Sequence, residues 1–84
     1  MTDHRDILGE YLAPGTLVRH DGPVEGGPEY GVIVDCWIDD GEFYDCFVVF
    51  VDNIPLEQAR RERPYVFRYA STSLVVIDRS EWPL

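Results

Sequence analysis

The fold is decided by residues 30–51, YGVIVDCWIDDGEFYDCFVVFV, in which two apolar stretches flank a short acidic turn. β-Branched and aromatic residues, which favour strands, make up most of Tyr30–Ile38 and Phe43–Val51. Between these stretches, Asp40-Gly41 is a residue pair that tolerates the positive φ angles of a two-residue hairpin turn. The sequence therefore predicts an antiparallel β-hairpin in the middle of the chain.

Two registers of this hairpin are compatible with the sequence. A two-residue turn pairs Cys36 with Asp45, which places a carboxylate on an otherwise apolar face. A three-residue turn pairs Cys36 with Cys46, leaves that face without a charge, and is the only register that permits a disulfide between them. Turn chemistry favours the first register and an uncharged core favours the second. A β-bulge partway along the hairpin would satisfy both.

Shorter elements are predicted on either side of the hairpin. Before it, Pro14-Gly15 marks a turn, residues 16–20 a strand, and the Gly- and Pro-rich residues 21–29 a surface loop. After it, residues 56–63 (LEQARRER) form either one or two helical turns or a charged excursion. Two further strands are expected at residues 65–69 and 74–77, with a turn between them. The all-β class, as a small five-stranded barrel with a long first loop and a charged insertion before the fourth strand, fits this order.

Three segments carry a resemblance to a known kind of protein: Pro14–His20 (PGTLVRH), Tyr30–Val34 (YGVIV) and Ser73–Ile77 (SLVVI). They resemble small SH3-like barrels of the KOW-like type, especially short phage-encoded or phage-associated proteins. The resemblance implies an SH3-like barrel over residues 13–78 and a phage context, and it carries over no catalytic residues. It leaves an N-terminal segment, residues 1–12, in which Ile7–Leu12 are spaced for a short helix, and a C-terminal tail, residues 79–84.

The charge distribution argues against nucleic acid as a direct ligand. The 84-residue chain has a formal net charge of −9, and residues 30–52 contain six carboxylates and no basic residue. Nucleic-acid binding draws mainly on Lys and Arg that neutralise phosphates, and KOW-type nucleic-acid binders tend to be basic. No apolar run reaches the roughly 20 residues of a membrane span, and the charged N-terminus lacks a signal-peptide pattern. We therefore expect a cytoplasmic protein, in the host cytoplasm or a virion if it is phage-encoded.

No pattern in the sequence predicts catalysis, a metal or a cofactor. His20 beside Asp21 lacks a nucleophile, and Gly26-Gly27 is not followed by the helix that phosphate-binding loops require. The acidic cluster of Asp39, Asp40 and Glu42 lacks the spacing of a calcium loop. The two cysteines are too few for a disulfide framework or a zinc site, and we interpret them as buried thiols in a reducing compartment. A non-enzymatic protein is expected.

The hairpin is apolar on both faces, whereas a hairpin with one solvated face alternates apolar and polar residues. In either register Ile33 and Trp37 lie opposite the main core face. A small barrel has one interior, so the second face needs a cover. The candidates are the N-terminal segment around Ile7–Leu12, residues 52–64, or another protein chain.

We therefore expect a protein–protein interaction module, a phage accessory or virion protein that self-associates or binds a host protein. Aromatic anchors beside carboxylates suit an Arg-rich partner surface, and a second copy would supply one, giving a homo-oligomer. The candidate partner-binding residues are Trp37, Asp39, Asp40, Glu42, Phe43, Tyr44, Arg60, Arg61 and Arg63. A simpler interpretation is that Trp37 and Tyr44 only shield the hairpin end. The alternative function is an acidic mimic of nucleic acid that inhibits a host DNA- or RNA-binding enzyme.

Overall fold

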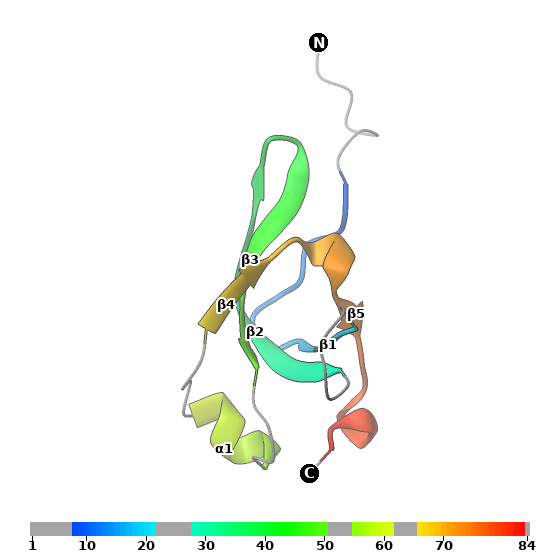
Figure 1. The fold of residues 1–84 in the computed structure, drawn as a ribbon. Coiled ribbons are helices and arrows are strands. Elements are labelled where there is room, and N and C mark those ends of the chain that lie inside the picture. Colours follow the sequence, from blue (N-terminus) through cyan, green and yellow to red (C-terminus); the bar gives the residue numbers. More distant parts are fainter. Residues whose placement is uncertain (1–7, 22–27, 51–54, 62–65, 84) are drawn as a thin grey trace.

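The computed structural model describes residues 8–21, 28–50, 55–61 and 66–83, and most of its elements are strands (Figure 1). In chain order they are β1 (Leu17–His20), β2 (Glu29–Asp39), β3 (Glu42–Phe50), α1 (Leu56–Arg61), β4 (Val66–Tyr69), the 3-10 turn η2 (Ser71–Ser73), β5 (Val75–Val76) and the 3-10 turn η3 (Arg79–Glu81). The predicted all-β class is confirmed. The segment after the hairpin does form a helix over the residues that the structure describes.

All five strands of the described chain belong to one antiparallel sheet, in the order β4-β3-β2-β1-β5. The long strands β2 and β3 are neighbours in this sheet and form the predicted hairpin. β4 and β5 are its two edges, so the sheet is open across the described residues. Closure into a barrel is not confirmed.

The hairpin register shifts by one residue in its middle and then returns. Next to the turn Ile38 pairs with Phe43, as a two-residue turn requires, but Asp35 pairs with Phe47, one residue out of that register. The original register is restored at Ile33, because the extra residue falls in β2 on one side of Asp35 and in β3 on the other. The expected bulge is therefore confirmed, as a pair of bulges that cancel.

Each face of the sheet carries its own cluster of buried residues. The first core consists of Leu12, Val18, Ile33, Cys36, Cys46, Val48, Phe50 and Leu74. The second core, on the other face, consists of Leu17, Val32, Val49, Leu56, Ala59, Ile77 and Trp82. Neighbouring residues of one strand go to different cores because side chains alternate along a strand: Val48 and Val49, both fully buried, are the clearest case.

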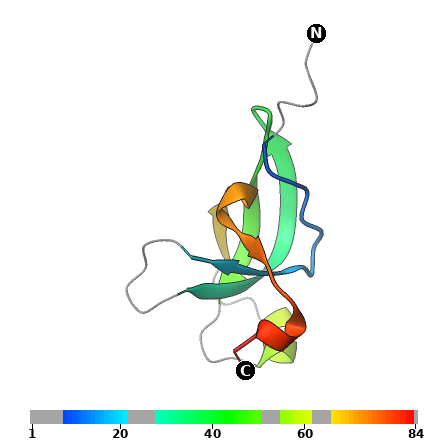
Figure 2. The ribbon, with the colours of Figure 1, turned by 90° about the vertical axis from the view of Figure 1, so that its right-hand side faces the viewer.

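The chain itself covers most of the second face. Leu56 and Ala59 of α1 pack there, together with Ile77 and Trp82 from the C-terminal end. Figure 2 shows η3 beside α1, and Nη2 of Arg79 donates to Oε1 of Glu57 at 3.0 Å. Of the segments that were expected to cover the second face, residues 52–64 therefore do so through α1. Residues 79–84 were expected to form a C-terminal tail. Instead, Trp82 of this segment is buried, with 7% of its surface exposed.

Among the described residues, the structure has no helix that is both long and apolar enough to cross a membrane.

Candidate protein-binding surface at the hairpin end

The end of the β2–β3 hairpin projects beyond its neighbouring strands (Figure 1). Over the residues that the structure describes, β1 pairs with β2 from Glu29 to Val32, and β4 pairs with β3 from Cys46 to Val49. The turn itself is the predicted two-residue turn, with Asp40 at φ 53° and Gly41 at φ 75°. Two positive φ angles match the right-handed twist of the strands, so Asp-Gly suits this position. The hairpin thus carries its turn beyond β1 and β4, while Phe43 beside the turn packs against the first core.

The N-terminal segment supports this projecting end. The N–H of Leu8 donates to the carbonyl of Gly41 at 3.0 Å, and the N–H of Phe43 donates to the carbonyl of Leu8 at 2.9 Å. These bonds form a parallel bridge beside β3, so the short helix expected around Ile7–Leu12 does not form over residues 8–12. The chain then runs back along the hairpin until Leu12 reaches the first core. Ile7 lies outside the described residues.

Exposed apolar side chains gather at this end. Leu8 is 58% exposed, Tyr11 56% and Ile38 47%. The rings of Tyr11 and Phe43 meet edge to face with centroids 6.2 Å apart, and Ile38 is the register partner of Phe43. Direct register partners share a face of an antiparallel pair, so Ile38 and Phe43 lie on one face, with Tyr11 against the Phe43 ring. Leu8, the bridge partner of Glu42, is exposed beside this face at the same end of the molecule. We call Leu8, Tyr11, Ile38 and Phe43 the tip patch.

Carboxylates lie at the same end of the molecule as the tip patch. Asp39 and Asp40 are exposed and Glu42 is half-buried, and Glu10 is exposed on the supporting segment. Four of the described arginines have carboxylate partners, and one of them, Arg68, reaches Asp45 at the base of the projecting end. Arg19 pairs with Asp21, Arg68 with Asp45, and Arg60 and Arg79 with Glu57. The hairpin end is therefore an apolar patch within a negative field.

The aromatic candidates divide between the two faces of the hairpin. Trp37 packs against Phe47, with ring centroids 4.9 Å apart, and both are half-buried. Trp37 is adjacent in sequence to Cys36, which belongs to the first core, so Trp37 faces the other way from the tip patch. Tyr44 is its register partner, but the side chain of Tyr44 lies outside the described part. Trp37 and Phe47 thus cover the second face of the hairpin in the part that α1 does not cover.

The arginine candidates lie far from the tip. Arg60 and Arg61 are exposed on α1, at the end of the molecule opposite to the hairpin tip (Figure 1). Nε of Arg61 donates to the carbonyl of Glu57 at 3.4 Å, and Arg60 Nη1 lies 3.7 Å from Oε1 of the same residue. Arg63 lies outside the described residues. A contact between the acidic tip and these arginines would therefore join two molecules, not two parts of one.

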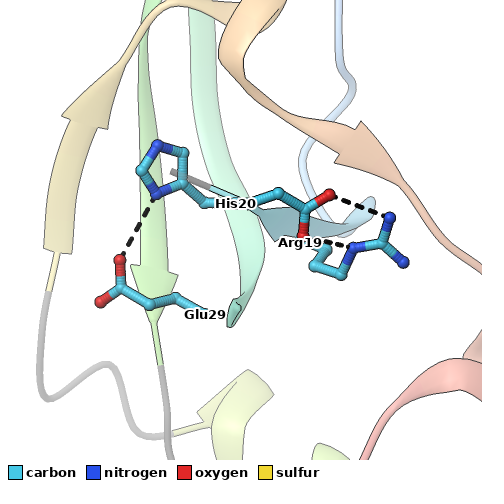
Figure 3. A network of polar contacts seen from close by, with 4 residues as sticks. Arg19, His20 and Glu29 are labelled. Carbon is cyan, nitrogen blue, oxygen red and sulfur yellow. Dashed lines mark hydrogen bonds and ion pairs between the residues drawn. The ribbon is translucent and has the colours of Figure 1, made fainter. Parts of the chain in front are cut away.

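A second polar cluster lies where β1 and β2 diverge (Figure 3). His20 pairs with Glu29, Nδ1 to Oε1 at 3.4 Å, whereas Asp21 accepts two hydrogen bonds from Arg19. The imidazole also stacks on Tyr69, with ring centroids 4.4 Å apart. The His20–Asp21 neighbourhood in the sequence therefore does not become a contact. His20 acts as a packing residue that joins β1, β2 and β4.

Other candidate sites offer little. A small pocket of about 190 Å³ lies between the Pro14-Gly15 turn and α1, and its lining includes Val32, Val49 and Ala59 of the second core and Arg60. That volume is below the roughly 300–1,000 Å³ of ordinary ligand pockets. Across the described ranges, no three His, Cys, Asp or Glu side chains gather in a way that could hold a metal ion.

The sequence identified the carboxylates and Phe43 but missed Leu8, Tyr11 and Ile38. Ile38 could have been found from its place beside the turn. The other two depend on a parallel bridge between segments more than thirty positions apart, for which the sequence has no local signal.

Comparison with known proteins gives no relative: no family model, no curated protein and no solved structure matches this chain.

Proposed function

We propose that this protein is a non-enzymatic docking module that binds a basic segment of another protein through the hairpin end. The observation that carries the proposal is the tip patch: Leu8, Tyr11 and Ile38, each about half exposed, gather at one end of the molecule, where a non-local bridge supports the hairpin. Contiguous exposed apolar surface on a small protein is typical of interaction sites. The surrounding carboxylates favour a partner that presents Lys or Arg around apolar side chains.

We further propose that the sheet is that of an SH3-like barrel. The strand order β4-β3-β2-β1-β5, the long connection after β1 and the 3-10 turn between β4 and β5 support it. The phage context, and with it a location in the host cytoplasm or in a virion, is supported by the resemblance of the sequence segments alone.

A partner from the host is favoured over a second copy. Glu57 forms ion pairs with both Arg60 and Arg79, so the α1 end is only weakly positive. The acidic-mimic alternative uses the same carboxylates but has no need of the tip patch. The two functions therefore differ in whether Ile38 matters.

The test compares two substitutions of similar exposure. Ile38 is 47% exposed in the tip patch and Val76 is 50% exposed on β5, so Ile38→Asp and Val76→Asp add the same charge to two exposed strands. Immobilised wild type, Ile38→Asp and Val76→Asp are exposed to host lysate, and retained proteins are identified by mass spectrometry. We expect a basic protein retained by wild type and Val76→Asp, and reduced at least tenfold with Ile38→Asp.

Equal retention by all three proteins, or no specific retention, would overturn the proposal. Retention that is unaffected by Ile38→Asp, that falls steeply between low and high salt, and that DNA competes away would establish the mimic instead.

A further inference from the structure

Cys36 and Cys46 form a close pair of thiols between the two central strands. Their sulfur atoms are 3.1 Å apart, and the side chains are 6% and 0% exposed. Both are free thiols in the first core. A disulfide bond is about 2.05 Å long, so a movement of about 1 Å would join them.

The bulges of the hairpin bring the two cysteines together. Between the pairs at Asp35 and Trp37, β2 has one residue, Cys36, whereas β3 has two, Asp45 and Cys46. Without the bulges, Cys36 would lie opposite Asp45, and the two cysteines would point to opposite faces of the sheet. Asp45 adopts a left-handed φ of 59° and contacts Nε of Arg68 at 2.8 Å, which holds its carboxylate outside the core. The irregular backbone thus places the two thiols next to each other across the two strands.

We propose that Cys36 and Cys46 are a redox modification site, which a peroxide oxidises to a disulfide that ties the projecting hairpin end to the sheet. Cys36, the more exposed of the two, attacks the peroxide as a thiolate and becomes a sulfenic acid. The sulfur of Cys46 then displaces water from it and forms the S–S bond. With hydrogen peroxide, two S–H bonds and one O–O bond break, one S–S bond forms, and two molecules of water are released.

The environment of Cys46 explains the order of these steps. Burial, with a further contribution from the neighbouring Cys36 thiol, raises the pKa of Cys46 to about 12. A thiol with so high a pKa is a poor first nucleophile, because the thiolate is the reactive form. It can still resolve a sulfenic acid that forms within van der Waals distance.

The disulfide would act on the segment that carries the docking surface. Residues 37–45, between the two cysteines, form the projecting end of the hairpin. The described parts of β1 and β4 pair with the other end of the hairpin, not with this segment. A bond across its base limits opening of this segment. Any effect on partner binding rests on the proposed function, whereas formation of the disulfide does not.

The test treats the folded, reduced protein with stoichiometric hydrogen peroxide, followed by acid quenching and intact-mass analysis. We expect a monomer lighter by 2 Da. Cleavage after Glu42 then yields two peptides that stay joined until a reductant is added. The matched control is the double variant Cys46→Ala, Val48→Cys, which moves the second thiol two residues along the same strand to another fully buried position of the first core.

We expect disulfide formation to be at least tenfold faster in the wild type than in this control, with slower amide exchange of residues 37–44 after oxidation. Equal rates, over-oxidation to sulfinic acid, inter-chain dimers, or a disulfide that forms only in denaturant would each overturn the proposal. The oxidised and reduced proteins are then compared in the lysate capture. Unchanged capture would break the link to docking, and absent capture would count against the proposed function, while in both cases the redox site stands.

Discussion

Asp45 shows how one residue can determine which side chains enter the core. Its left-handed backbone forms part of the bulge that brings Cys46 to the same face as Cys36, and non-glycine residues adopt this conformation at a cost. Aspartate tolerates it better than most residues because its short side chain forms local hydrogen bonds. The contact with Arg68 adds little stability, since Arg68 is largely exposed.

Asp45→Gly and Asp45→Ala therefore separate the backbone conformation from the ion pair, because both remove the carboxylate. Only glycine accepts φ 59° without strain. We expect Asp45→Gly to be more stable than Asp45→Ala by about 1 kcal/mol, measured by urea unfolding. Equal stability of the two variants would mean that the left-handed bulge is not retained in solution.

The raised pKa of Cys46 makes stability depend on pH in the alkaline range. The folded thiol titrates at about 12 and an ordinary thiol at 9.0, so the folded state holds its proton more tightly. Its contribution to stability is complete below pH 9 and is lost as the pH rises toward 12. We expect the unfolding free energy of the reduced protein to fall over this range more steeply than that of Cys46→Ala. Parallel pH profiles for the two proteins would show that the thiol is not desolvated.

At the scale of elements, α1 is a short helix that owes its stability to the sheet. Six residues are too few for a helix that is stable alone, and only Leu56 and Ala59 are buried. Glu57 in its first turn and Arg60 and Arg61 in its last turn complement the helix dipole. The helix thus contributes to stability by covering the second core.

Truncating the buried side of α1 should therefore affect the whole domain. We expect Leu56→Ala to lower the unfolding free energy by about 2–4 kcal/mol, because Leu56 is 4% exposed. The control, Arg61→Ala in the same helix, removes an exposed side chain and should change it by less than about 0.5 kcal/mol. Urea unfolding followed by tryptophan fluorescence measures both. A Leu56 variant as stable as the control would show that α1 is not docked.

The elements differ in how far the sequence determines them. The hairpin was predictable because its apolar stretches and its Asp-Gly turn are local signals. The placement of the bulges was not predictable from the sequence, because it depends on whether Asp45 or its neighbour Cys46 packs in the first core. The C-terminal cover was missed since Trp82 stands alone in residues 79–84, without periodicity. The same limit applies to the candidate site, whose carboxylates are local features, whereas Leu8 and Tyr11 join it through non-local contacts.

At the scale of the whole molecule, a single thin sheet separates two cores. The sequence showed that both faces of the hairpin are apolar, and one expectation was that another protein covers the second face. The structure assigns that role to α1 and the C-terminal end. Docking at the hairpin end therefore concerns exposed surface at the edge of the first core, and the domain needs no partner to bury Val32 or Val49.

Val48 and Val49 test this two-sided arrangement directly, because they are adjacent, fully buried and assigned to different cores. We expect Val48→Ala and Val49→Ala each to lower the unfolding free energy of the isolated chain by about 1–3 kcal/mol, since each removes two buried methyl groups and leaves a cavity. Val76→Ala, on the exposed edge strand β5, should change it by less than about 0.5 kcal/mol. A loss at Val48 with none at Val49 would mean that the second face is not packed in the free protein. The second core would then form only when another chain covers it, and the docking surface would have to be moved from the hairpin tip to that face.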